Sequence, residues 1–80
     1  MTAQEIALKW FDAAKTKNTP SILKNTWLIL DIVEGHRPHE SVIWPAAEWL
    51  ATLKDGEQKQ IIVAEVVKAY PKTQSLFVAK

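Results

Sequence analysis

The residues best suited to chemistry in this chain are its two histidines and the carboxylate beside them. His36, His39 and Glu40 fall within five positions, and imidazole and carboxylate groups are common zinc ligands. A zinc site needs three or four rigidly held ligands, and paired histidines on one helical face are usually four residues apart. Here the spacing is shorter, Pro38 intervenes, and the sequence has neither a cysteine nor a third histidine. The pattern therefore indicates a polar turn, and we expect no metal site and no cofactor.

Nucleophilic catalysis has no stronger support. A catalytic serine needs an adjacent, oriented base, and acyl-transfer enzymes place it in a tight turn flanked by glycines. None of Ser21, Ser41 and Ser75 has such neighbours, and Ser41 is better explained as a helix cap. Two glycines in the whole chain cannot form a phosphate-binding loop. We therefore expect that the chain is not an enzyme.

Length, composition and charge limit the classes of protein to which this chain can belong. The 80 residues, of which 48% are hydrophobic and 24% charged, fit a single globular domain over residues 1–80. The net charge is +1 and the ten basic residues are scattered, whereas nucleic-acid-binding domains usually carry a basic cluster. No uninterrupted apolar run exceeds four residues, the N-terminus lacks the pattern of a signal peptide, and cysteine is absent. These features predict a cytoplasmic protein without a membrane partner.

The first helix is predicted over about residues 2–17. Thr2 and Glu5 have the spacing of a capping box, in which each side chain accepts a hydrogen bond from the backbone N–H of the other residue. Apolar residues then recur at helical spacing along one face, with charged residues on the other. The pattern ends in a run of polar residues at Lys15 to Asn18.

A second helix is predicted over residues 20–34. Thr19 provides a cap and Pro20 occupies the first helical position, where its missing N–H costs nothing, and Gly35 ends the helix. Apolar residues cover most of its circumference. Polar residues are confined to a narrow strip, which consists of Lys24, Asp31 and Glu34. A helix of this kind is normally the central one of a bundle.

The third helix is predicted over residues 41–54, with Ser41 as its cap and Pro45 in its first turn. Helical spacing divides its apolar residues into two strips. The strip predicted to face the core contains Val42, Ala46, Trp49, Leu50 and Leu53. The strip predicted to face away from it contains Trp44, Ala47 and Ala51.

The C-terminal segment allows two interpretations. Asp55 and Gln58 have capping-box spacing, and the residues that follow share a helical face, which favours a helix over 57–69. The many β-branched residues instead fit a β-hairpin of strands 60–68 and 75–79. The helical interpretation predicts an all-α protein, a small antiparallel four-helix bundle. The alternative is three helices followed by a hairpin, similar in layout to a winged helix.

The surplus of apolar side chains predicts a function in binding another protein or a second copy of the chain. Four short helices around one core cannot bury them all, and two alanines one turn apart allow another helix to approach closely. We therefore predict a non-enzymatic interaction module, such as an adaptor, an inhibitor or a small subunit. The alternative is a nucleic-acid-binding regulator of the winged-helix or helix-turn-helix type. The residues predicted to bind the partner are Trp44, Ala47, Ala51 and a half-exposed Trp27.

Overall fold

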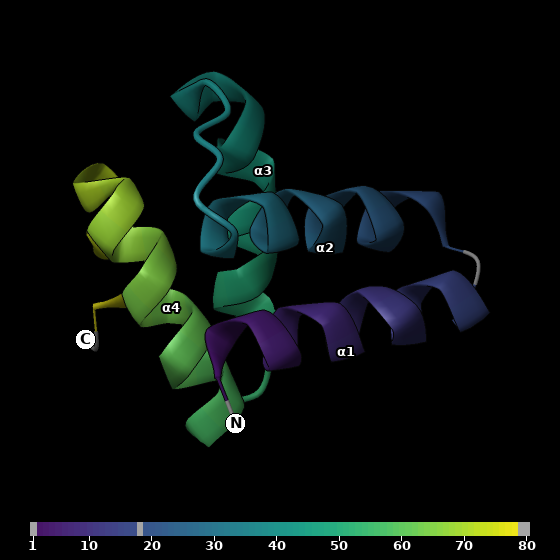
Figure 1. The fold of residues 1–80 in the computed structure, drawn as a ribbon. Helices are drawn as coiled ribbons and strands as arrows, with labels where there is room; N and C mark the ends of the chain where they lie inside the picture. Colours follow the sequence, from purple (N-terminus) through teal and green to yellow (C-terminus); the bar gives the residue numbers. More distant parts are fainter. Residues whose placement is uncertain (1, 18, 79–80) are drawn as a thin grey trace.

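The computed structural model describes residues 2–17 and 19–78, and these form helices and turns without any strand (Figure 1). The elements are α1 (Ala3–Lys17), α2 (Pro20–Val33), α3 (Glu40–Thr52), α4 (Glu57–Ala69), the 3-10 turn η1 (Pro71–Thr73) and the short α5 (Gln74–Phe77). The predicted all-α class is confirmed. The alternative hairpin is not supported, because 60–68 lies within α4, and the winged-helix arrangement that depended on it is lost with it.

The start of α1 follows the predicted capping box. The backbone N–H of Thr2 donates to Glu5 Oε1 over 3.0 Å, and the N–H of Glu5 donates to Thr2 Oγ1 over 3.2 Å. Backbone and side-chain bonds from Thr2 favour the ionised carboxylate, so they lower the pKa of Glu5. Two N–H groups at the open end of the helix are thereby satisfied.

The caps of α3 and α4 differ from the predicted ones by one or two residues. His39, not Ser41, caps α3, and its Nδ1 accepts a hydrogen bond from the N–H of Ser41 over 3.1 Å. Pro45 is therefore the sixth residue of α3, and it removes only the N–H that would bond the carbonyl of Ser41. The bounds predicted for α4, residues 57–69, are confirmed, but its N-cap is Gly56 and no side chain of Asp55 caps it.

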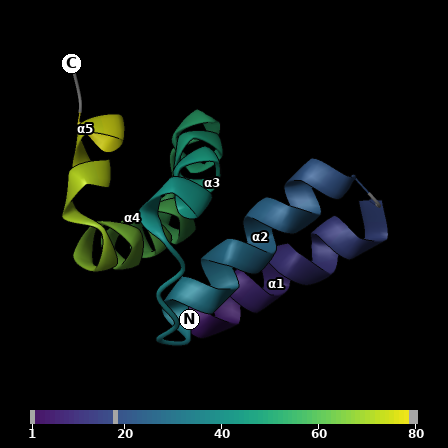
Figure 2. The same ribbon diagram turned by 90° about the horizontal axis from the view of Figure 1, so that it is seen from above.

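The four long helices form one antiparallel pair, α1 and α2, and two helices, α3 and α4, that pack across it (Figures 1 and 2). Antiparallel α1 and α2 lie side by side and make the most extensive packing in the chain. α3 crosses α2 at a steep angle, and α4 packs against both α1 and α2. The far end of the α1–α2 pair, near residues 17 and 20, extends beyond α3 and α4 (Figure 1). No helix of the described chain is long and apolar enough to cross a bilayer.

One core joins all four long helices. Its buried residues are Ile6, Ala7, Ile29, Ile32, Val33, Ile43, Ala47, Leu50, Ile62, Val66 and Tyr70. The hydroxyl of Tyr70, just after α4, donates a hydrogen bond to the carbonyl of Pro38 in the α2–α3 connection. Burial raises the pKa of Tyr70, so the phenol keeps the proton that this bond requires. The bond joins the end of α4 to the connection between α2 and α3.

Candidate partner-binding surface

The strip of α3 predicted to face a partner is largely covered by the chain itself. Ala47 is only 2% exposed, and Trp44 and Ala51 are half-buried, whereas Val42, which was predicted to face the core, is 45% exposed. The predicted orientation of α3 was therefore wrong for Ala47 and Val42. The physical reason is that α3 packs against α2 on one side and against α4 and α5 on others, so both of its apolar strips find neighbours within the chain.

Trp27 is the exposed aromatic residue of the predicted set. It is 57% exposed on the outer face of α2, as its position beside the polar strip predicted. Its ring meets the ring of Phe11 edge to face, with centroids 5.9 Å apart, and its Nε1–H donates to Asp31 Oδ2 over 3.1 Å. These two contacts orient the indole while leaving more than half of it in water.

A shallow apolar hollow surrounds Trp27 on the outer face of α2. We call this surface the α2 patch, and its residues are Pro20, Leu23, Lys24, Trp27 and Leu28. The hollow has a volume of about 390 Å³. The α2 patch thus combines an apolar surface with a single charge, that of Lys24.

A larger groove lies on the inner side of the end of the α1–α2 pair that extends beyond α3 and α4. It has a volume of about 630 Å³, and its walls include Trp10 from α1, Ile22 from α2 and Trp49 from α3. The rings of Trp10 and Trp49 meet edge to face with centroids 6.4 Å apart. Lys17 and Lys54 also line the groove. A volume of this size is typical of small-ligand pockets, but the groove is an open channel between elements and not an enclosed cavity.

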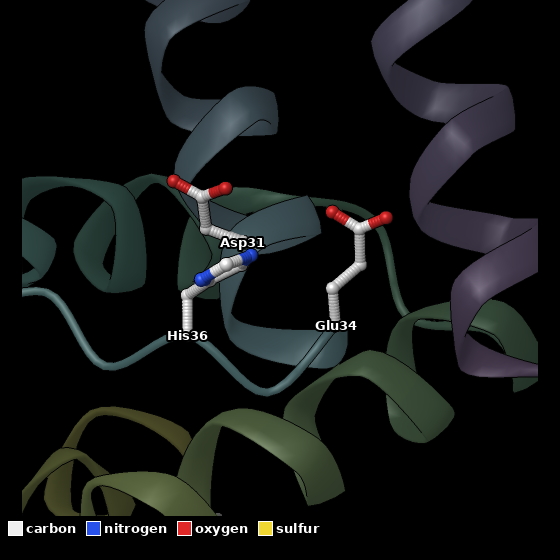
Figure 3. Close-up of side chains that lie close together, drawn as sticks. All are labelled: Asp31, Glu34 and His36. Atoms are coloured by element: carbon white, nitrogen blue, oxygen red, sulfur yellow. The ribbon is translucent and has the colours of Figure 1, made fainter.

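The two histidines, considered together in the sequence, have different neighbours in the fold. His39 caps α3, with its Nδ1 2.8 Å from Ser41 Oγ. His36 lies instead at the end of α2 beside Asp31 and Glu34 (Figure 3). The sequence pattern did not associate these two carboxylates with His36, because they precede it at the end of the helix, whereas His39 and Glu40 follow it in the sequence. The signal that could have revealed them is Gly35, a residue that lets the chain fold back over the preceding helical turn.

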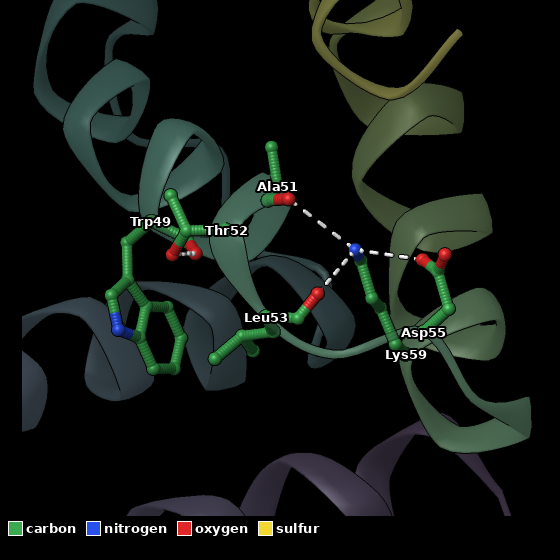
Figure 4. A network of polar contacts seen from close by, with 6 residues as sticks. All are labelled: Trp49, Ala51, Thr52, Leu53, Asp55 and Lys59. Atoms are coloured by element: carbon green, nitrogen blue, oxygen red, sulfur yellow. Dashed lines mark hydrogen bonds and ion pairs between the residues drawn. The ribbon is translucent and has the colours of Figure 1, made fainter. Parts of the chain in front are cut away.

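A polar network centred on Lys59 joins α3 to α4 next to the groove (Figure 4). The ammonium group of Lys59 donates to the carbonyl of Leu53 over 2.7 Å and to that of Ala51 over 3.3 Å. It also donates to Asp55 Oδ1 over 3.1 Å. Lys59 thus satisfies carbonyls that the end of α3 leaves without helical partners. The role of Lys59 was not predicted from the sequence, where Asp55 was predicted to be a helix cap.

Comparison with known protein families, with curated proteins and with solved structures finds no match to the chain. A function must therefore be argued from the surfaces described above. Of these, the α2 patch is the one that presents a large aromatic side chain to solvent.

Proposed function

We propose that this chain is a non-enzymatic interaction module that binds a second copy of itself through the α2 patch. The observation that carries the proposal is the 57% exposure of Trp27 within an apolar surface. Tryptophan anchors many protein interfaces, because one ring buries a large area with little loss of conformational freedom. Trp27 is already oriented by Phe11 and Asp31, which lowers that cost further.

A second copy fits because the outer face of α2 is complementary to itself. Two α2 helices packed antiparallel about a two-fold axis can place Trp27 of each chain against Leu28 of the other. The same pairing places Lys24 opposite Asp31, since these residues are equally far from the axis. Opposite charges then face each other at both ends of the contact, whereas a parallel arrangement would bring like charges together.

The expected association is weak. A large aromatic side chain presents up to about 250 Å², so the open part of Trp27 amounts to roughly 140 Å². Its burial contributes about 3.5 kcal/mol at ~25 cal/mol per Å², or about 7 kcal/mol for the two rings of a dimer. Lost translational and rotational freedom opposes association by at least ~4 kcal/mol. With the contribution of the smaller apolar side chains, the Kd is expected between ~10 µM and ~1 mM.

Sedimentation equilibrium over a range of chain concentrations tests this proposal. The unmodified chain should show a reversible monomer–dimer equilibrium, and Trp27→Lys should weaken it at least ~10-fold. Val42→Lys is the matched control, because it also places a lysine at an exposed apolar position, on α3, and it should leave the equilibrium unchanged. A chain that stays monomeric at ~1 mM, or a dimer that Val42→Lys disrupts and Trp27→Lys does not, contradicts the proposal.

Charge reversal tests the antiparallel pairing separately. Lys24→Glu and Asp31→Lys each place like charges opposite one another and should each weaken the dimer. Combining the two substitutions restores opposite charges and should recover most of the lost affinity. If the losses simply add in the double variant, Lys24 and Asp31 are not opposed, and the two-fold arrangement is wrong.

A further inference from the structure

We infer that the C-terminal turn of α2 binds a divalent transition-metal cation of the zinc class through Asp31, Glu34 and His36. Each side chain offers one ligand atom, and the three atoms lie within 4.8 Å of one another. In Figure 3 the imidazole of His36 lies close to Asp31, and the carboxylate of Glu34 extends on the same side of the turn. This inference does not depend on self-association through the α2 patch.

The backbone at the end of α2 brings these three residues together. Asp31 and Glu34 are three residues apart, so they lie on neighbouring positions of one helical face. At Gly35 the backbone has a φ of +100°, which glycine adopts without the penalty of other residues. The chain then folds back, and the N–H of His36 donates to the carbonyl of Asp31 over 2.9 Å. This bond places the imidazole over the last helical turn, beside both carboxylates.

The ligand atoms of the cluster are available to a cation. Within the described part of the chain, the side chains of Glu34 and His36 form no hydrogen bond or ion pair, and Asp31 accepts one bond, from Trp27. That bond restricts the orientation of the carboxylate, as residues around metal ligands commonly do. The carbonyl end of a helix also carries partial negative charge, which attracts cations.

The positive charge of Arg37 could oppose a bound cation, but its guanidinium is directed to the backbone. Its Nη1 donates to the carbonyl of His36 over 2.7 Å and to that of Ile32 over 3.0 Å. No ion pair joins Arg37 to the carboxylates of the cluster among the residues described. Among the described residues of a single chain, neither carboxylate therefore has an ion pair that would compete with a cation.

The donor set selects the class of metal. Calcium and magnesium prefer oxygen ligands throughout, whereas an imidazole together with carboxylates suits zinc, cobalt, nickel and copper. Zinc–nitrogen and zinc–oxygen bonds of about 2.0–2.2 Å place tetrahedral ligand atoms about 3.3 Å apart. The cluster therefore has to contract by roughly 1.5 Å at most, which partly exposed side chains achieve by small rotations. Three protein ligands leave a fourth position to water.

Calorimetric titration of the whole chain with zinc chloride tests the inference. We expect one zinc ion per chain, and His36→Gln and Glu34→Gln should each weaken binding at least ~10-fold. His39→Asn is the matched control, because it removes the other imidazole while asparagine still caps α3, and it should leave the affinity unchanged. Magnesium should bind at least ~10-fold more weakly than zinc.

Three results overturn the inference: an unmodified chain that binds no zinc, a zinc affinity that survives His36→Gln, or one that falls equally with His39→Asn. Circular dichroism of each variant shows whether the helices persist, so a loss of binding is not mistaken for a loss of fold. Asp31 is shared with the proposed Lys24–Asp31 pairing, but Glu34 and His36 belong neither to the α2 patch nor to that pairing, so their variants separate this inference from the proposed function. Self-association can fail while zinc binding holds, and the reverse.

Discussion

Replacing Lys59 by methionine should destabilise the chain more than replacing any lysine on the open surface. The side chain of Lys59 is only 12% exposed, and its ammonium group bonds the carbonyls of Ala51 and Leu53 at the end of α3. Methionine has a similar length and apolar stem but offers no hydrogen-bond donor. The substitution therefore removes the polar link between α3 and α4 and leaves two carbonyls with poorer partners.

The magnitude follows from the three bonds. A hydrogen bond to a charged group contributes about 1.5–3 kcal/mol, and the 2.7 Å bond to Leu53 is the strong one of the set. The 3.3 Å bond to Ala51 adds less, and the pair with Asp55 adds at most ~0.5 kcal/mol because that carboxylate is 94% exposed. Relief from burying the ammonium group offsets part of the loss. The net destabilisation is about 2 kcal/mol, or a fall in Tm of roughly 8–16 °C for a domain of this size.

Thermal and urea unfolding of matched variants measure this effect. Lys68→Met is the control, since Lys68 is an exposed lysine of the same helix, and it should change stability by no more than ~0.5 kcal/mol. Asp55→Asn should likewise cost no more than ~0.5 kcal/mol, because the two carbonyl bonds remain. If Lys59→Met unfolds at the same temperature as Lys68→Met, the network in Figure 4 does not stabilise the α3–α4 connection and the reasoning fails.

Two further predictions concern α3 and the start of α1. Ala47→Glu should lower the free energy of unfolding by at least ~3 kcal/mol, because Ala47 is 2% exposed and lies in the apolar core, where a charge is not solvated. Ala46→Glu should do the same, because Ala46 is 1% exposed. A melting curve for Ala47→Glu like that of the unmodified chain would mean that α3 is rotated outwards. The lowered pKa of Glu5 means that its contribution to stability is fully present above its ordinary value of 4.5 and is lost as the pH falls through the folded value. Unfolding midpoints measured from pH 5 downwards should therefore fall less steeply in Glu5→Gln, and an unchanged slope would contradict this.

The ends of the helices were predictable from the sequence wherever the signal is local. The capping pair of Thr2 and Glu5 acts within one turn, and Pro20 and Gly35 restrict the backbone at their own positions. Errors arose at the capping residues of α3 and α4. His39 caps α3 in place of Ser41, and Asp55 bonds Lys59 instead of capping α4. For α3 a nearby side chain offered a comparable hydrogen bond, and sequence spacing could not rank the two; for α4 the carboxylate of Asp55 is bonded by Lys59, and the cap position falls to Gly56.

The residues of the candidate sites were harder to predict from the sequence than the helix ends, because their exposure depends on the tertiary fold. The exposure of Trp27 was predictable, since the polar strip of α2 runs beside it. The burial of Ala47 was not, because it results from neighbours that are distant in sequence. The association of His36 with Asp31 and Glu34 was less predictable than the exposure of Trp27 but more so than the burial of Ala47. It needs only one turn of helix and a reversal of the chain at Gly35.

The sequence by itself determined that the first three long helices form, where all four long helices begin and end to within one or two residues if the last forms, and that α2 is apolar around most of its surface; it left open whether the C-terminal segment is helix or hairpin, and it did not predict η1 or α5. These properties depend on interactions within a single turn, whose free energies are nearly independent of the rest of the chain. Only the tertiary structure decided which face of α3 is buried, that Lys59 joins α3 to α4, and that the far end of the α1–α2 pair is left uncovered. Those outcomes depend on how crossed helices share a limited core, because an apolar side chain is stabilised equally well by any neighbour that excludes water from it.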